Sequence, residues 1–203
     1  MIKVAQVISV IGHPLFMPLY AILLILQFNP YIQLQVPNLL QPFVLGTIIV
    51  FTIVLPCITS LILKSMGVIN SLYMNTTKER KWPFIFTLIW YYLGFYLLSK
   101  MGLPESLYLL MIGAISVILT AHFITLRWKI SVHMIGIGGL IGAIVGISCR
   151  FQYDHINIIY LLIFFAGTIG YSRLKTNSHN SQQVYAGFVL GFLVEWLILS
   201  VLS

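Results

Sequence analysis

The chain has 203 residues, of which 60% are hydrophobic and only 7% are charged. A soluble globular domain carries about 25% charged residues, so this composition excludes an ordinary soluble fold and indicates a membrane protein. The net charge of +7 would suggest a nucleic-acid partner in a soluble protein, but here the basic residues stand at the ends of apolar runs. Anionic lipid headgroups are therefore the expected partners, within a lipid bilayer and with no nucleic acid.

Apolar runs long enough to cross a bilayer recur along the whole sequence. We predict spans at residues 4–27, 41–63, 83–99, 105–126, 132–149, 156–172 and 184–202. The loops between them are mostly short, so residues 1–203 are predicted to form one domain, an all-α polytopic bundle of membrane helices. Pro14 and Pro18 should kink the first run or split it into an interfacial piece and a span. Six full spans are therefore the alternative to seven.

The basic residues are distributed unevenly between the two membrane faces when the spans are counted in order. Nine share one face: Lys3, Lys64, Lys78, Arg80, Lys81, Arg127, Lys129, Arg173 and Lys175. Lys100 and Arg150 lie on the other face. The positive-inside rule makes the first face cytoplasmic. Setting aside four of the nine as candidate site residues leaves five against two, which points in the same direction.

Polar residues gather in three segments, at residues 64–82, 129–133 and 172–179. Two spans separate each segment from the next, so all three are predicted to reach the same membrane face and to build one site. The last segment reads Ser-Arg-Leu-Lys-Thr-Asn-Ser-His and lies between two apolar runs, where cations are costly to place near lipid. Basic, hydroxyl and imidazole groups together indicate a site that binds an anion and acts on it, with phosphate as the expected anion.

Small residues in two of the runs predict helices that pack closely. Gly138, Gly142 and Gly146 repeat at four-residue spacing, and Gly187 and Gly191 repeat that spacing in the last run. A small residue at every fourth position lets a neighbouring helix backbone approach. The pattern therefore predicts rigid helices directly after two of the polar segments.

The sequence predicts no metal site and no cofactor. Cys57 and Cys149 both lie inside predicted spans, without the spacing of a disulfide framework or of a metal site. Clusters of carboxylates, which magnesium prefers, are also missing from the sequence. No glycine-rich loop follows a predicted strand, which excludes a dinucleotide site.

Three motifs resemble the signatures of the type-2 phosphatidic acid phosphatase family, which shares its site with vanadium haloperoxidases. Residues 172–179 match Ser-Arg-x5-His of the third signature, Ser-Arg-x5-His-x3-Asp. Residues 131–133, Ser-Val-His, resemble the second signature, Pro-Ser-Gly-His, and residues 80–83, Arg-Lys-Trp-Pro, resemble a degenerate form of the first, Lys-x6-Arg-Pro. His13-Pro14 is similar to a feature of compact bacterial members. The motifs have the family's order and span residues 78–191, about half of the chain.

The resemblance implies a lipid phosphatase that removes the terminal phosphate of a lipid phosphate or isoprenyl pyrophosphate in a bacterial cytoplasmic membrane. His179 would match the nucleophile that becomes a phosphohistidine, and His133 the general acid that protonates the leaving oxygen. Six residues would bind the phosphate oxygens: Lys78, Arg80, Lys129, Ser131, Ser172 and Arg173. Positioned cations of this kind are what phosphoryl transfer requires.

Gln183 departs from the third signature, because it stands where the family has the Asp that orients the nucleophilic histidine. A Gln carbonyl can hold an imidazole in one tautomer, but it cannot neutralise a developing imidazolium. In serine proteases the corresponding Asp to amide change costs about 10⁴-fold in turnover. Glu79 or Glu195 could supply the charge instead. The alternative function is a non-catalytic or transport protein that binds anionic lipid headgroups.

Several of these polar residues also have structural interpretations. Ser131 could cap the helix that follows it. We interpret His13 and His122 as residues packed within the bundle, and His155 with Asp154 as a solvated turn on the opposite face.

Overall fold

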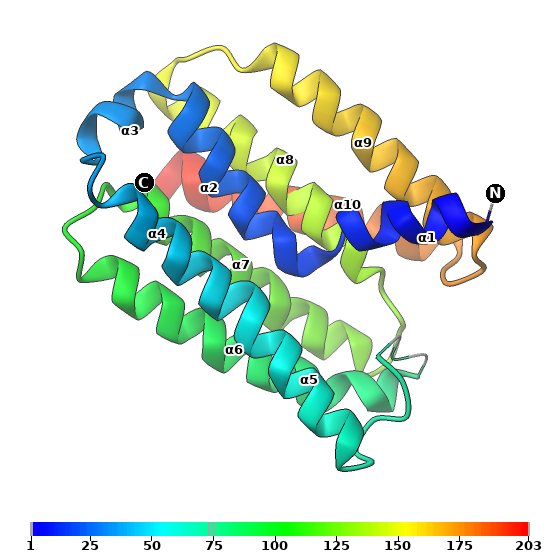
Figure 1. The fold of residues 1–203 in the computed structure, drawn as a ribbon. Helices are drawn as coiled ribbons and strands as arrows, with labels where there is room; N and C mark the ends of the chain where they lie inside the picture. Colours follow the sequence, from blue (N-terminus) through cyan, green and yellow to red (C-terminus); the bar gives the residue numbers. More distant parts are fainter. Residues whose placement is uncertain (1, 73, 75, 203) are drawn as a thin grey trace.

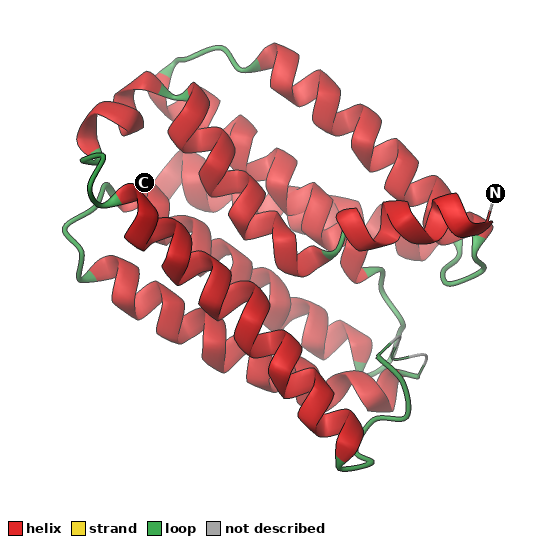
Figure 2. Ribbon diagram, viewed as in Figure 1, coloured by secondary structure: helices red, strands yellow, loops and turns green. Residues whose placement is uncertain are grey.

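A computed structural model describes residues 2–72, 74 and 76–202, with side chains described from residue 7 to residue 201 apart from residues 73 and 75. Within these residues every regular element is helical, and short loops join the helices (Figure 2). The elements are α1 (Ile2–Ile11), η1 (Pro14–Phe16), α2 (Met17–Phe28), α3 (Pro30–Gln35), α4 (Gln41–Ile48), η2 (Ile49–Val54), α5 (Leu55–Ser65), α6 (Thr77–Ser99), α7 (Glu105–Thr125), α8 (Val132–Phe151), α9 (Ile156–Lys175), α10 (Ser181–Leu197) and η3 (Ile198–Leu202). The prediction of an all-α chain is confirmed for the described residues.

Seven helical segments of the described chain are long and apolar enough to cross a membrane: residues 7–28, 41–65, 77–99, 105–125, 132–151, 156–175 and 181–201. This confirms the prediction of a polytopic membrane bundle with seven candidate spans. The third span was predicted to start at residue 83 and starts at Thr77 instead. A capping box in which Thr76 and Glu79 bond to each other's backbone nitrogens extends the helix into the polar segment.

The first span is broken, as its prolines predict. Pro14 has no N–H group, so the carbonyl of Val10 cannot receive the usual helical bond from residue 14. The N–H of His13 donates to Val10 instead, at 3.2 Å, and α1 ends at Ile11. The chain then resumes as α2 in a different direction, and α1 lies beside the C-terminal part of α9 (Figure 1).

The pair α8 and α10 makes the most extensive contact between helices. A Cβ atom added at Gly138 would overlap with the carbonyl of Phe188, and one added at Gly191 would overlap with the carbonyl of Ile135. At Gly187 an added Cβ would lie 2.6 Å from the carbonyl oxygen of Ser131. The predicted close packing is confirmed, and it fixes the N-terminal ends of the two parallel helices side by side.

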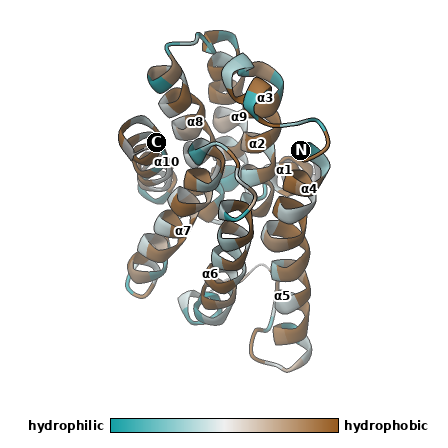
Figure 3. Cartoon of the chain, turned by 90° about the vertical axis from the view of Figure 1, so that its left-hand side faces the viewer, coloured by the Kyte–Doolittle hydropathy of each residue, from teal (hydrophilic) through white to brown (hydrophobic). Residues whose placement is uncertain are grey.

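Polar residues concentrate at the two ends of the bundle. Hydrophobic residues occupy most of the length of the helices, and hydrophilic residues occur chiefly in the loops and at helix ends (Figure 3). The loops α5–α6, α7–α8 and α9–α10 lie at one end together with α1, whereas α3 and the α6–α7 loop lie at the other (Figure 1). The side chain of Lys3, which the charge count places at the first end, is outside the described residues.

Candidate functional site

Hydrogen bonds join the three polar segments at one end of the bundle. Arg80, in the first turn of α6, donates from Nη1 to the carbonyl of Ile130 at 3.0 Å. The backbone N–H of Ser131 donates to the carbonyl of Gln183 at 3.3 Å, and Oε1 of Gln183 lies 2.9 Å from Nδ1 of His179 in the third segment. The prediction that these segments, although separated in sequence, meet at one end is confirmed. We call the polar side chains gathered there the cationic cluster: Arg80, Lys129, Ser131, His133, Ser172, Arg173, His179 and Gln183.

The α9–α10 turn brings residues of the third segment into this cluster. Its backbone closes α9 through the N–H groups of residues 176–178, which donate to carbonyls of the last helical turn. Asn177 adopts a φ of 51°, a left-handed conformation that asparagine tolerates better than most residues. Asn180 then begins α10 with a capping box, in which its side chain accepts from the N–H of Gln183. His179 is therefore held between two fixed helix ends.

His179 is buried and carries a defined tautomer. Its Nδ1 lies 2.9 Å from Oε1 of Gln183. An amide oxygen only accepts, so Nδ1 carries the proton and Nε2 keeps its lone pair. Burial lowers the pKa of His179 to about 4, the Gln183 bond opposes that shift, and repulsion by Arg80, Lys129 and Arg173 adds to it. The imidazole is thus neutral at neutral pH.

Three cations surround this neutral histidine. The Arg80 side chain is only 6% exposed, and its Nε donates to the carbonyl of Met74 at 3.3 Å. Burial lowers the pKa of Lys129, and the nearby Arg80 and Arg173 lower it further. Bringing like charges together in a partly buried place is unfavourable. The arrangement therefore leaves three like charges near one another without a counter-ion among the described side chains.

Two hydrogen-bond donors in the cluster are buried without a partner in the described part of the chain: the hydroxyl of Ser131 and Nε of Arg173. Ser131 occupies the N-cap position of α8, yet its side chain makes no capping bond, so the capping interpretation is wrong. A buried donor without an acceptor is costly. Both groups are suited to bind an oxygen of the same anion.

The sequence interpretation missed the contribution of the first helix. Nε2 of His133 lies 3.1 Å from the carbonyl oxygen of Ser9. The hydroxyl of Ser9 accepts from Nη1 of Arg173 at 3.0 Å and lies 2.9 Å from the hydroxyl of Ser172. The His13 ring packs edge-on against His133, with 5.4 Å between centroids. The signal was the His-Pro break in an apolar run, because such a break exposes backbone groups that need partners.

The chain has four acidic residues, and none of them contacts the cluster among the described contacts. Glu79 accepts from the N–H groups of Asn70 and Thr76. Glu195 is buried inside the bundle, where the absence of a side chain at Gly113 makes room for its carboxyl group. Neither supplies the charge that Gln183 lacks. The other two, Glu105 and Asp154, lie at the opposite end.

The structure does not place Lys78 and His155 where the sequence analysis expected them. Lys78, an expected phosphate ligand, is exposed on α6, and the described contacts do not join it to the cluster. The solvated turn predicted around His155 is wrong for the histidine itself. His155 is 5% exposed, and its Nδ1 lies 2.8 Å from the hydroxyl of Ser148.

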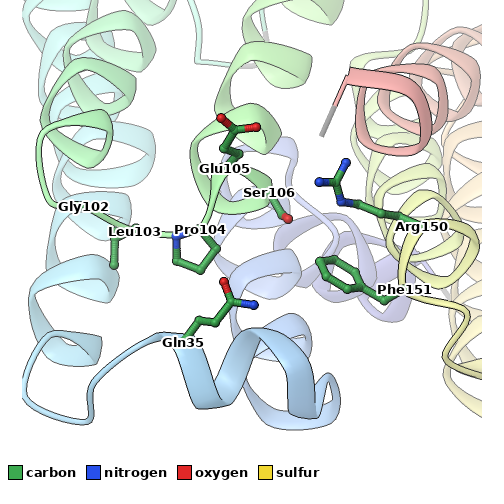
Figure 4. A pocket seen from close by; sticks show the side chains of 8 residues that line it. All are labelled: Gln35, Gly102, Leu103, Pro104, Glu105, Ser106, Arg150 and Phe151. Carbon is green, nitrogen blue, oxygen red and sulfur yellow. The ribbon is translucent and has the colours of Figure 1, made fainter.

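Two cavities are described, and both lie at the opposite end of the bundle. The larger, of about 500 Å³, is lined by Gln35, Gly102, Leu103, Pro104, Glu105, Ser106, Arg150 and Phe151 (Figure 4). Acidic and basic side chains from α7 and α8 both border it. The smaller, of about 200 Å³, adjoins His155.

Among the described residues no group of three or more His, Cys, Asp or Glu side chains could hold a metal ion.

The chain matches no model of a known protein family, no curated protein and no solved structure.

Proposed function

We propose that this protein is a membrane lipid phosphatase with the fold and chemistry of the type-2 phosphatidic acid phosphatase family, acting in a bacterial cytoplasmic membrane. The observation that carries the proposal is the neutral, buried His179, oriented by Gln183 and surrounded by Arg80, Lys129 and Arg173. A nucleophile held in one tautomer among cations that bind an anion is the arrangement that phosphoryl transfer requires.

The cations and Ser131 would hold the terminal phosphate. Arg80 and Arg173 offer planar forks that match phosphate oxygens, and Lys129 offers a point charge. The free hydroxyl of Ser131 and the free Nε of Arg173 would each gain an acceptor. Binding would also relieve the repulsion among the three cations, so one dianion would stabilise the whole cluster.

Catalysis would proceed in two balanced steps. The lone pair on Nε2 of His179 attacks phosphorus, and the bond from phosphorus to the lipid oxygen breaks. His133 enters this step as the imidazolium, which a bound phosphate dianion favours, and gives its Nδ1 proton to that oxygen. The lipid therefore leaves as an alcohol, or as a monophosphate when the substrate is a pyrophosphate. Water then attacks the phosphohistidine, gives a proton back to His133, and releases inorganic phosphate. Gln183 keeps Nδ1 of His179 protonated throughout.

Binding of anionic lipid headgroups without cleavage is the second candidate, and Gln183 favours it. Its Oε1 is a neutral acceptor that also receives the N–H of Asn180 at 3.3 Å, so its position is explained by helix capping alone. Without a carboxylate, the imidazolium that develops on His179 is stabilised less well.

The deciding experiment is phosphate release by the detergent-solubilised protein from phosphatidate, phosphatidylglycerophosphate, an isoprenyl pyrophosphate and a lipid A phosphate. Release that His179→Ala abolishes supports the phosphatase. If no lipid yields phosphate while vesicles of anionic lipid still bind the protein, the headgroup-binding function replaces it.

A further inference from the structure

Within the part of the first helix whose side chains the structure describes, Ser9 contacts both the predicted acid and a predicted phosphate-binding cation. Its backbone carbonyl lies 3.1 Å from Nε2 of His133, and its hydroxyl accepts from Nη1 of Arg173 at 3.0 Å. The same hydroxyl lies 2.9 Å from that of Ser172. Since Arg173 can only donate, the Ser9 hydroxyl hydrogen is free to point to Ser172.

The break in the first span explains why the Ser9 carbonyl is available. In an unbroken helix this carbonyl would accept from the N–H of residue 13. Here the N–H of His13 donates to the carbonyl of Val10, because Pro14 has no N–H to donate to that carbonyl. The proline thus releases the carbonyl of Ser9, and His133 becomes its partner.

Close packing brings α1 to the cluster. A Cβ atom added at Gly12 would lie 2.5 Å from a side-chain carbon of Ile169 on α9, so any larger residue would have to displace the end of that side chain. On the other side, a Cβ at Gly136 of α8 would lie 3.0 Å from Cα of Pro14. The broken segment is therefore wedged between the two helices that carry Arg173 and His133.

We propose that Ser9 is a positioning residue, whose hydroxyl sets the guanidinium of Arg173 for the anion and whose carbonyl sets the tautomer of His133. The catalytic part of this inference rests on the proposed phosphatase function, but the anion-binding part requires only that the cluster binds an oxyanion. With Nε2 of His133 donating to Ser9, Nδ1 is the nitrogen left to exchange the proton: it carries a proton in the imidazolium that acts as the acid and none in the neutral ring.

The hydroxyl contact is tested by Ser9→Ala and Ser9→Thr, with Ser116→Ala as the matched control. The Ser116 hydroxyl bonds only within its own helix, to the carbonyl of Ile112 at 2.8 Å. Tungstate affinity of the purified protein is measured by calorimetry, and KM and kcat are measured with an aryl phosphate. A lost hydrogen bond to a charged group should weaken tungstate binding and raise KM by about tenfold in Ser9→Ala, whereas Ser9→Thr and Ser116→Ala should resemble the unmodified protein.

The carbonyl contact is tested by Pro14→Ala. Alanine restores an N–H for Val10 and lets the N–H of His13 return to the Ser9 carbonyl, in competition with His133. Nitrogen NMR of labelled histidine should show the Nε2–H tautomer of His133 in the unmodified protein and a mixture in Pro14→Ala. Turnover of a lipid phosphate should fall more than that of an aryl phosphate, since only the poorer leaving group needs the acid.

The outcomes separate this inference from the proposed function. If the unmodified protein binds tungstate but cleaves no lipid phosphate, the phosphatase is wrong, and the tungstate and tautomer measurements still decide the role of Ser9. Equal tungstate affinity in Ser9→Ala, or an equal loss in Ser9→Thr, would overturn the hydroxyl role. An unchanged tautomer in Pro14→Ala would overturn the carbonyl role, and a chain that binds no tungstate would overturn the anion-positioning role together with the phosphatase.

Discussion

Both ends of the bundle contain a buried histidine, but the charged side chains near it differ: they are of both signs at one end and only positive at the other. At the end with the cavities, His155 bonds to Ser148 and packs edge-on against Tyr153 with 5.0 Å between ring centroids. Glu105 and Arg150, of opposite charge, border the same cavity there (Figure 4). The buried histidine at this end therefore has a local partner, and the charges that border the cavity are of both signs.

At the other end, like charges gather around His179, and in the described part of the chain no contact links any of the four carboxylates to them. Such a cluster costs stability, because repulsion and desolvation act together. A buried histidine is therefore no evidence of a site by itself, since both ends have one. The informative feature is unbalanced buried charge, which marks the end where an anion would be stabilising.

The largest expected effect comes from removing the histidine at each end. His179→Ala should lower turnover by at least about a thousandfold, because the proposed nucleophile is lost, while circular dichroism stays that of the folded bundle. His155→Ala should keep turnover and lower the free energy of unfolding by about 1 kcal/mol, the value of a hydrogen bond. Equal turnover losses in the two variants would show that the two ends do not differ in function.

His133→Ala should sharpen the assignment within the cluster. Turnover of a lipid phosphate should fall by about 10²-fold or more, since a poor leaving group needs a proton. An aryl phosphate leaves without one, so its turnover should fall much less. A similar loss for both substrates would assign His133 to structure instead of to acid catalysis.

Arg173→Lys tests whether the site needs the planar, bidentate guanidinium of arginine or only a positive charge. Vanadate inhibition should weaken by roughly tenfold to a hundredfold, because lysine cannot form the bidentate contact or keep the bond to Ser9. Arg150→Lys is the matched control at the opposite end, where the side chain is exposed. Unchanged vanadate inhibition in Arg173→Lys would remove Arg173 from the site.

The sequence predicted the span pattern and the meeting of the three polar segments well, for a simple reason. The length of a hydrophobic run shows whether it can cross the bilayer, and the number of spans between two segments shows whether they lie on the same membrane face. Both quantities can be counted in the sequence. The glycine spacing also predicted that both α8 and α10 pack closely against a neighbour, although not that they pack against each other, because close backbone approach leaves few other residue types possible at Gly138 or Gly191.

Contacts that depend on how helices turn could not be predicted. Ser9 has no motif around it. Its proposed role depends on three contacts of the broken segment: the carbonyl that Pro14 leaves free, the packing of Pro14 against α8, and the approach of Gly12 to α9. The burial of His155 was missed for a related reason, since its partner Ser148 lies on the preceding helix and sequence hydropathy does not show which loop folds back.

Gln183→Glu produces the smallest and most specific expected change. The structure favours glutamate over the family's aspartate for this test, because Oε1 of Gln183 already lies 2.9 Å from Nδ1 of His179 and also caps α10. Glutamate keeps that reach and adds the missing negative charge. The exposed neighbour Gln182 offers a matched control, since Gln182→Glu adds the same charge one residue away and outside the cluster.

The expected direction of the pH dependence of kcat/KM in Gln183→Glu follows from the proposal that neutral His179 is the nucleophile. His179 must be unprotonated to attack, so kcat/KM for an aryl phosphate should fall as the pH drops through its pKa, which is about 4 in the unmodified protein. A carboxylate at position 183 favours the imidazolium and raises that pKa, so the acidic limb should move to higher pH in Gln183→Glu and stay in place in Gln182→Glu. Above that limb, turnover should rise by about tenfold, because the carboxylate also stabilises positive charge that develops on the ring. An acidic limb that moves equally in both variants would mean that surface charge, and not the bond to His179, controls the titration.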